Sequence, residues 1–350
     1  MRQFTVNTKN FSDETPPYLI AEVGHNHQGN LETALKLIRA ASHAGASAVK
    51  FQKRFNKTLF TAEAYDAPYT SENSFGDTYG KHREALEFGL EEYQACIEVA
   101  KRCNVDFFAT AFDFESADFL AALDMPAYKM ASGDLKSIPL IEYVAKLGKP
   151  IILSTGGGSI EDVDRAVDAV LKHNKNLALL QCTAGYPPEY SELNLRVIET
   201  FRARFPEVTI GYSGHDSGIA MGLVAYILGA RVIEKHFTLN RTMKGTDHAF
   251  SLEPQGMQKL VRDIERARLA LGDGEKRTYP SEVATLKKMG KSIFYKHSLA
   301  GGDILKTEHV DFRSPGDGTP PYRVAEFVGK ELLKNVIAGS KLMYEDFLND

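Results

Sequence analysis

Histidines are the residues of this sequence that most directly suggest chemistry. His25 and His27, separated by one asparagine, follow the apolar run YLIAEVG at residues 18–24. Alternate residues of an extended chain point the same way, so an H-x-H just past a strand is a candidate metal site. His215 and His236 close two later apolar runs, and imidazole is a ligand for Mn, Fe, Co and Zn. The sequence therefore contains two candidate metal pairs.

Small hydroxyl residues and glycines follow three other apolar runs. The segments MASGD, TGGGS and GHDSG come directly after Lys129, Ser154 and Ser213, respectively. Glycine lets backbone N–H groups approach an anion, and the amino end of a following helix adds partial positive charge. Together with Lys50, these segments predict a site for a phosphate, or for a ligand with both phosphate and carboxylate groups.

Acidic residues complete the set of candidate groups, namely Glu22, Asp134, Glu234 and Asp247. Two lysines, two histidines and several carboxylates suit acid–base chemistry around a carbonyl polarised by a metal. The residues alone therefore predict a metal-using lyase, aldolase or transferase that acts on a small phosphorylated anion.

These residues need a scaffold that brings them together. Short β-rich runs alternate with amphipathic helical patterns at 18–24, 47–52, 106–112, 127–132, 150–156, 177–183, 208–214 and 231–237. Eight βα units in series predict an α/β fold in which a parallel sheet closes into a (β/α)8 TIM barrel. Polar residues at the carboxyl ends of the strands should point into the mouth of that barrel, where barrel enzymes keep their active sites.

Several connections have signals of their own. Asn30 is the expected cap of the helix that starts near Leu31, and Ser159 with Asp162 matches a capping box. Residues 53–90 are too long and irregular for a plain βα connection, so we expect them to fold over the mouth as a lid.

The chain is expected to contain two domains. Residues 1–271 form the catalytic barrel, and residues 272–285 form a polar linker that contains glycine and proline. Residues 286–350 have short β-like runs and tight turns without a βαβ rhythm, which predicts a small β-rich domain.

The predicted barrel separates the two histidine pairs. An H-x-H on the first strand is typical of metal-dependent amidohydrolases, which also need histidines on strands five and six, and those runs have none. His215 and His236 end the seventh and eighth strands, which are neighbours in a closed barrel. We therefore expect this pair to bind the metal, and we expect His25 and His27 to be loop residues that shape or line one end of the site.

Composition restricts the class of protein. The 350 residues are 43% hydrophobic and 25% charged, with a formal net charge of −4, which favours a small-molecule substrate over nucleic acid or an acidic membrane. The three cysteines are widely spaced and odd in number, so a disulfide framework is not expected. Since the N-terminal segment has no apolar signal and no run is long enough to span a membrane, we expect a cytoplasmic protein.

Several of these stretches together resemble one family. LIAEVGHNHQGN, AVKFQK, YKMASGD, IILSTGGGS, LLQCTAGYP, IGYSGHDSG and IEKHFTLNRTMKGTDHAFSLEP are similar, in that order, to the sialic acid (N-acetylneuraminate) synthases. The final segment, with LAGGDILKTEHVDFRSPGDG, resembles their antifreeze-like SAF module, a β-clip domain. YTSENSFGDTYGKHREALEF and GYSGHD look most like the animal branch. Relatives that make legionaminic acid, pseudaminic acid, KDN or spore-coat sugars are also possible matches.

The resemblance implies a condensation of phosphoenolpyruvate with the open-chain aldehyde of an N-acylated hexosamine, typically N-acetylmannosamine or its 6-phosphate. It also implies a role for each matching residue. His215 and His236 match ligands for Mn²⁺ or Mg²⁺, and the residues that match phosphoenolpyruvate contacts are Thr110, Lys129, Ser132, Ser154 and Ser213. The residues that match positions around the reacting centre and the sugar are Glu22, Lys50, Gln52, Asn73, Asp134, Tyr186, Glu234 and Asp247. Arg313 matches an arginine that the SAF module of one protomer extends into its partner's site, which implies a domain-swapped homodimer.

The sequence also departs from the family pattern. Ala184 and Asp134 stand where many members have Asn and Glu, and a serine separates Arg313 from the Pro-Gly pair. Sequence leaves open whether the acceptor carries a 6-phosphate. The basic residues of the lid segment that are candidates for binding one are Lys53, Arg54, Lys57, Lys81 and Arg83. A second class stays open, a barrel that serves as scaffold for a carbohydrate-binding SAF module.

Overall fold

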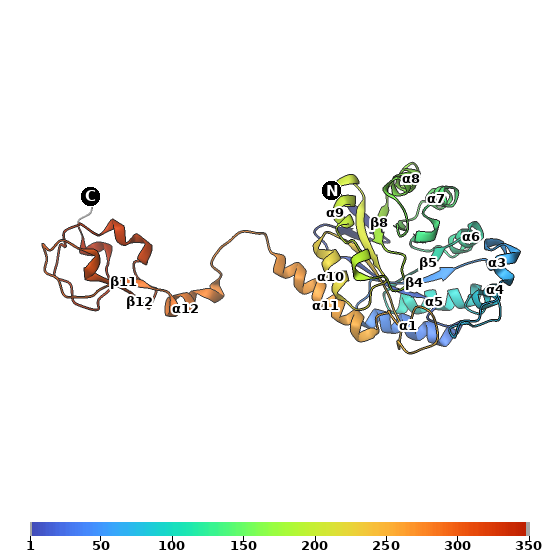
Figure 1. Ribbon diagram of the computed structural model, residues 1–350, viewed down its shortest axis with the longest axis horizontal. Helices are drawn as coiled ribbons and strands as arrows, with labels where there is room; N and C mark the ends of the chain where they lie inside the picture. The colour runs from blue at the N-terminus through green and yellow to red at the C-terminus, as the bar shows by residue number, and fades with distance from the viewer. Residues whose placement is uncertain (1, 348–350) are drawn as a thin grey trace. The chain divides into compact units, whose positions relative to one another are not determined.

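The computed structural model describes residues 2–347, and the chain divides into two compact units, Met1–Leu271 and Gly272–Asp350. In the first unit, eight parallel strands close into a barrel in the order β10-β3-β4-β5-β6-β7-β8-β9 (Figure 1). The strands are β3 (Tyr18–Gly24), β4 (Ala48–Lys53), β5 (Asp106–Ala111), β6 (Tyr128–Met130), β7 (Ile151–Ser154), β8 (Leu177–Cys182), β9 (Thr209–Gly214) and β10 (Val232–His236). The barrel predicted from the sequence is confirmed, and each strand lies within the predicted range or within a residue of it.

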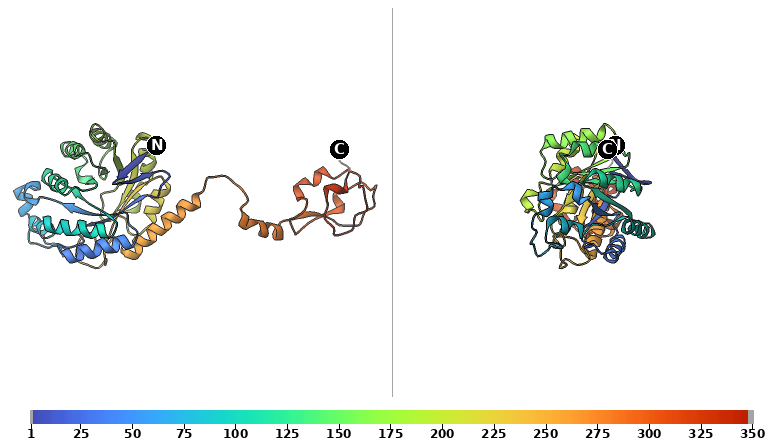
Figure 2. Two further views of the ribbon diagram at one scale, coloured as in Figure 1. Left: turned by 180° about the vertical axis from the view of Figure 1, so that it is seen from behind. Right: turned by 90° about the vertical axis from the view of Figure 1, so that its right-hand side faces the viewer.

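Helices cover the outside of the barrel, with α1 between α5 and α11 (Figures 1 and 2). They are α1 (Leu31–His43), α5 (Leu90–Arg102), α6 (Phe114–Ala122), α7 (Ile138–Lys146), α8 (Ile160–Leu171), α9 (Val197–Arg204), α10 (Ala220–Ile227) and α11 (Pro254–Leu271). Short 3₁₀ turns follow β6 at Ser132–Asp134 and β8 at Tyr190–Glu192. None of the helices that the structure describes is long and apolar enough to cross a bilayer.

Two helix starts behave as the sequence predicts. The Asn30 side chain accepts a hydrogen bond of 2.8 Å from the backbone N–H of Thr33 and thereby caps α1. The Ser159 hydroxyl accepts from the backbone N–H of Asp162, and the Asp162 carboxylate accepts from the backbone N–H of Ser159. This capping box fixes the start of α8, so Ser159 is structural.

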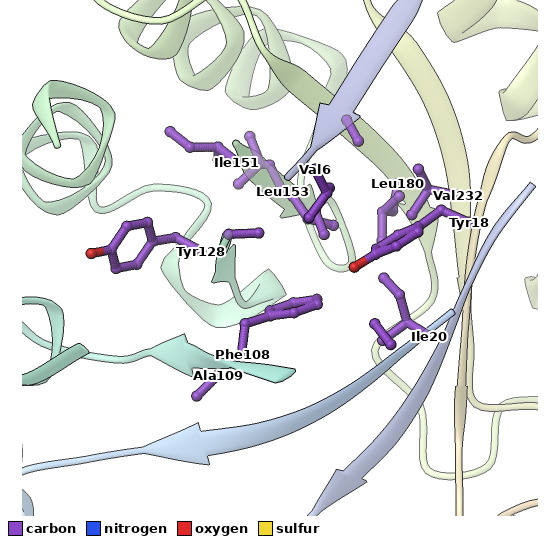
Figure 3. Close-up of a cluster of buried hydrophobic side chains, with 14 of the residues drawn as sticks. Val6, Tyr18, Ile20, Phe108, Ala109, Tyr128, Ile151, Leu153, Leu180 and Val232 are labelled. Atoms are coloured by element: carbon purple, nitrogen blue, oxygen red, sulfur yellow. The ribbon is translucent and has the colours of Figure 1, made fainter. Parts of the chain in front are cut away.

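A hairpin that the sequence analysis did not predict closes the amino-terminal end of the barrel. It consists of β1 (Gln3–Val6) and β2 (Lys9–Ser12). Phe4 and Val6 are fully buried, and Phe11 packs on Tyr18 at the start of β3, with ring centroids 4.7 Å apart. Figure 3 shows Val6 in a cluster of buried apolar side chains that includes Tyr18, Ile20 and Phe108 of the barrel strands. The apolar packing at this end leaves the opposite, carboxyl-terminal mouth as the open end.

The segment between β4 and β5 contains three short helices, α2 (Asn56–Leu59), α3 (Ala62–Asp66) and α4 (Tyr79–Glu84). We call residues 53–90, the range expected to fold as a lid, the lid segment. It supplies side chains to the cavity at the barrel mouth, as expected for a segment that folds over that end.

The second unit has its own small core around Ile293, Tyr295, Leu305 and Phe327. Its antiparallel sheet pairs β11 (Ser292–Tyr295) with β12 (Val310–Arg313), and helix α12 (Pro280–Met289) begins inside the segment assigned to the linker. Three 3₁₀ turns complete the unit, at Thr307–His309, Pro321–Glu326 and Tyr344–Asp346. A small antiparallel sheet agrees with the expected β-rich composition of this part of the chain.

Candidate active site

A cavity of about 540 Å³ opens at the carboxyl ends of the barrel strands, and every barrel strand contributes to its lining. The predicted site residues that line it are Glu22, Lys50, Gln52, Thr110, Lys129, Ser132, Ser154, Tyr186, Ser213, His215, Glu234, His236 and Asp247. The exceptions are Asn73, Asp134 and Arg313. Residues more than 200 positions apart are therefore brought to one site, because all eight strands run in the same direction.

Lys50 is the centre of a buried network of charges. Its Nζ lies 2.6 Å from Oε2 of Glu22 and 3.8 Å from Oε2 of Glu234, and it donates a 2.8 Å hydrogen bond to the hydroxyl of Thr110. Gln52 donates to the other oxygen of Glu22 at 2.8 Å. Strand register produces this group, since Glu22 pairs with Lys50 and Gln52 pairs with Thr110 across neighbouring strands.

Lys129 forms the second positive centre. Its Nζ donates to the hydroxyl of Ser154 at 2.6 Å and lies 4.0 Å from Oε1 of Glu234, which also accepts from the hydroxyl of Ser213 at 3.0 Å. A Cβ on Gly156 would lie 2.9 Å from the hydroxyl of Ser132 and 3.0 Å from the backbone nitrogen of Ala184, so a side chain here would displace one of these groups. The backbone N–H of Gly156 donates to that same hydroxyl at 3.0 Å. Ammonium, hydroxyl and backbone donors therefore converge where the sequence predicts an anion.

The two central carboxylates differ in their affinity for a proton. Burial raises the pKa of Glu22 above its ordinary value, although the Lys50 ammonium opposes this shift. Burial also acts on Glu234, but Lys129 and Lys50 together hold the pKa of that carboxyl below its ordinary value. Two carboxylates whose environments push their pKa values apart are suited to different roles in acid–base chemistry.

His215 and His236 lie side by side with their ring centroids 5.3 Å apart, and both are buried. The Thr183 carbonyl can only accept, so Nδ1 of His215, at 2.9 Å, donates to it and leaves Nε2 as an unprotonated nitrogen. Tyr186 stacks on the His215 ring at 4.1 Å. Nδ1 of His236 is buried without a hydrogen-bond partner and lies 3.7 Å from Oδ2 of Asp247.

These two imidazoles fit a divalent ion. Burial lowers the pKa of both rings, that of His215 to about 4, so both are neutral at physiological pH and have a lone pair for a metal. Within residues 2–347, no group of three or more His, Cys, Asp or Glu side chains is arranged as a metal site. Two protein ligands would leave coordination positions for water and substrate oxygen atoms.

The two histidines of the H-x-H motif, in the first βα loop, lie in different environments. His25 lines the cavity and contacts guanidinium groups of Arg54 and Arg83. His27 is buried in a stack with Phe88, at 4.1 Å between centroids, and its Nδ1 accepts from the backbone N–H of Gly29. The rings, 6.0 Å apart, thus face different partners.

Comparison with known proteins identifies the family. The model of the NeuB family matches residues 37–276, which is more than half of the chain. The chain belongs to the NeuB family. It is 39% identical to the N-acetylneuraminate-9-phosphate synthase of Homo sapiens, a match that covers 94% of this chain and 92% of the human one.

Other relatives are named for the synthesis of a different acid. The N,N'-diacetyllegionaminic acid synthase of Campylobacter jejuni is 37% identical over 91% of this chain and 96% of its own length. Among solved structures, the sialic acid synthetase of Leptospira borgpetersenii, in complex with citrate, has a TM-score of 0.69 and 35% identity. That match covers 81% of this chain and 95% of the bacterial one.

The remaining predicted site residues lie outside the cavity lining. Asn73 of the lid segment accepts a 3.0 Å hydrogen bond from the backbone N–H of Gly245, in the loop after β10. Asp134 is half-buried after β6 with one oxygen unpartnered, and burial raises its pKa to about 6. Arg313 lies on β12 in the second unit, is exposed and pairs with Asp311, so its role toward another protomer stays a prediction.

Some groups of this NeuB family site had no signal in the sequence analysis. Phe75 and His82 of the lid segment line the cavity, although nothing in the spacing of that segment marks them. Lys235 faces away from the cavity, where its fully buried ammonium lies 2.8 Å from Oδ1 of Asp216, the residue after His215. The hydroxyl of Tyr212 donates to the same oxygen at 2.7 Å. Such a buried pair holds the loop that positions His215.

Proposed function

We propose that this protein is a nonulosonic (sialic) acid synthase. It condenses phosphoenolpyruvate with the open-chain aldehyde of an N-acylated hexosamine, N-acetylmannosamine or its 6-phosphate. The products are a nine-carbon 3-deoxy-2-keto acid and phosphate. The observation that supports this most directly is the buried network of Lys50, Lys129, Glu22 and Glu234 at the barrel mouth, next to two neutral histidines. Membership of the NeuB family supports the same reaction class.

Phosphoenolpyruvate has a phosphate and a carboxylate, and the donors around Lys129 suit such a dianionic ligand. We assign its binding to Lys129, Ser132, Ser154, Ser213 and Thr110. Lys129 and Ser154 are already in contact at 2.6 Å, so their donors need little rearrangement on binding.

His215 and His236 are the residues that would hold Mn²⁺ or Mg²⁺, with Asp247 beside them. A divalent ion bound there would supply positive charge to the aldehyde oxygen of the acceptor. Tyr186 and Gln52 are proposed to orient the acceptor, so that its aldehyde carbon is exposed to C3 of phosphoenolpyruvate. The new bond joins these two carbons, water adds at C2, and phosphate leaves.

A carboxylate is proposed to orient the water that adds at C2, and the candidates are Glu22, Glu234 and Asp247. Glu22 has the pKa that burial raises, which suits a group that takes up and returns a proton near neutral pH. Lys50, in contact with Glu22 and Thr110, is proposed to stabilise negative charge as the reaction proceeds.

The second unit is proposed to be the SAF module of a domain-swapped homodimer in the cytoplasm. In that arrangement Arg313 binds the acceptor in the site of the other protomer. Removal of residues 286–350 should then abolish activity, whereas a fully active monomeric barrel contradicts the proposal.

The direct test mixes the full-length protein with phosphoenolpyruvate, Mn²⁺ and N-acetylmannosamine or its 6-phosphate and measures phosphate release. We expect metal-dependent release that requires the sugar, and a product with the mass of the nine-carbon acid. No release with any aldehyde sugar favours a carbohydrate-binding scaffold, and metal-dependent hydrolysis of amides favours the amidohydrolase alternative.

A further inference from the structure

The lid end of the cavity contains two arginines that share one histidine. Nη1 of Arg54 lies 3.2 Å from Nε2 of His25, and Nη1 of Arg83 lies 3.4 Å from Nδ1 of the same ring. All three side chains line the cavity. Two guanidinium groups thus approach both nitrogens of a single imidazole.

This arrangement leaves hydrogen-bonding capacity unused. Burial, together with the two arginines, lowers the pKa of His25 well below its ordinary value, so the ring is neutral. A neutral imidazole has only one acceptor nitrogen, whereas guanidinium groups only donate. At least one of the two arginines therefore directs an N–H group toward another N–H, and its donor has no acceptor at this position.

Both guanidinium groups are held in place by other contacts. The guanidinium carbon of Arg54 lies 3.6 Å from the centroid of the Phe112 ring, and the Arg54 side chain is buried. Nη2 and Nε of Arg83 donate to the hydroxyl of Tyr79 at 2.9 and 3.1 Å. Arginines fixed in this way are preorganised for an oxyanion, since little side-chain freedom is lost on binding.

Two carboxylates lie nearby, and neither forms an ion pair with the guanidinium group of Arg54 or Arg83. Glu87 pairs with Lys53 at 3.3 Å and approaches His25 at 3.5 Å. Asp247 lies beside His236. Across residues 2–347, no carboxylate lies within ion-pair distance of Arg54 or Arg83. In accord with this, burial and the nearby Arg83 lower the pKa of Arg54 to about 10.

We propose that Arg54 and Arg83 bind a phosphate group on the acceptor sugar, so that the preferred acceptor is the N-acyl hexosamine 6-phosphate. This inference rests on the proposed function. The acceptor's aldehyde end faces His215 and His236, and its far end extends under the lid segment to the two arginines. The phosphate of phosphoenolpyruvate has separate partners around Lys129. Of the basic residues in the lid segment that the sequence offers for this role, only Arg54 and Arg83 line the cavity.

The test compares N-acetylmannosamine with its 6-phosphate as acceptor, using wild-type, Arg83→Gln and Arg54→Gln proteins. For each arginine variant, we expect kcat/KM with the 6-phosphate to fall by about 10- to 100-fold, the usual size of a lost charge-assisted hydrogen bond. The kcat/KM with the unphosphorylated sugar and the KM for phosphoenolpyruvate should stay within about twofold of wild type, because only one group of one substrate loses its partner.

The matched control is Lys81→Gln on the same helix as Arg83. Lys81 is exposed and paired with Asp77, so its replacement should change neither acceptor's kinetics.

Several outcomes overturn this assignment. One is a wild-type preference for the unphosphorylated sugar, and another is an equal loss with both acceptors in the arginine variants. A rise in the KM for phosphoenolpyruvate would assign the arginines to that substrate instead.

If neither sugar reacts, the proposed function fails. Calorimetric binding of mannitol 6-phosphate, compared with mannitol, then still tests the subsite. Binding that Arg83→Gln weakens at least about tenfold supports it, and equal affinities for the two polyols contradict it.

Discussion

Nζ of Lys50 lies 2.6 Å from Oε2 of Glu22, and both side chains are almost completely buried. The two residues are register partners on β4 and β3, so the sheet itself fixes their contact. The ammonium also faces Glu234 and the hydroxyl of Thr110. A buried cation with two carboxylate neighbours is costly to remove, because the remaining negative charges lose their compensation.

We predict that Lys50→Met lowers the free energy of unfolding by about 3–5 kcal/mol and abolishes phosphate release, since a buried carboxylate is left unpaired. Urea unfolding and the assay with phosphoenolpyruvate measure both effects. The double variant Lys50→Met with Glu22→Gln should recover part of the stability and none of the activity. A single variant as stable as wild type contradicts the energetic role of the pair.

His236→Ala should eliminate metal-dependent turnover. It should cost little stability, because Nδ1 of the ring makes no hydrogen bond to the residues that the structure describes. Calorimetric titration with Mn²⁺ should show weaker binding in the same variant, independently of turnover. The control is His173→Ala, since His173 is exposed after α8 and does not line the cavity. Unchanged activity in His236→Ala would rule out the assignment.

Elements with strong periodic patterns could be predicted from the sequence. The eight strands, the cap at Asn30 and the capping box at Ser159 follow local rules, and the direction of parallel strands places Glu22, Lys50 and His236 at one mouth. The hairpin of residues 3–12 could not be predicted, because its strands are only four residues long and the run KNFS is mainly polar.

Contacts that depend on the direction of side chains in irregular segments also could not be predicted from the sequence. The basic residues of the lid segment look alike in the sequence, but Arg54 and Arg83 line the cavity whereas Lys81 pairs with Asp77 at the surface. Lys235 is flanked by Glu234 and His236, and its opposite direction follows from strand alternation. Its partner Asp216 comes from a loop whose path no periodicity specifies.

The buried pair of Lys235 and Asp216 yields a prediction about positioning. Asp216→Ala should lower the free energy of unfolding by about 3–5 kcal/mol, because it leaves the Lys235 ammonium buried and unpaired. The double variant Asp216→Asn with Lys235→Met should lose less free energy of unfolding than Asp216→Ala, because it leaves no charge unpaired. Urea unfolding of the three proteins tests this. A double variant that loses as much stability as Asp216→Ala, or more, contradicts the proposed cost of the unpaired Lys235 ammonium.

Asp134 should make stability depend on pH. Burial raises its pKa from 3.8 to about 6, so folding favours the protonated form, and this contribution is lost as pH rises from about 4 through 6. Above pH 6, Asp134→Asn should therefore be more stable than wild type, on the order of 1–2 kcal/mol after allowance for partial exposure. The difference should vanish below about pH 4, where both proteins are uncharged at this position.

Guanidinium unfolding at pH 7.5 and pH 4 measures the effect of Asp134. The control is Asp168→Asn on α8, an exposed aspartate, which should show no comparable change between the two pH values. An Asp134→Asn variant with the same stability difference at both pH values would mean that folding does not change the pKa of this carboxyl.

Mixed dimers test whether Arg313 acts in the site of the other protomer. Arg313→Ala and His236→Ala homodimers should both be inactive, since the first lacks the proposed sugar contact and the second lacks a metal ligand. Co-expression of the two variants with different affinity tags allows purification of the mixed dimer.

If Arg313 acts in trans, one site of that dimer combines an intact barrel with an intact Arg313, and about half of the wild-type activity should return. If it acts in cis, each site retains one defect and the mixed dimer stays inactive. A protein that is monomeric at the assay concentration in analytical ultracentrifugation, yet fully active, contradicts the action of Arg313 in trans.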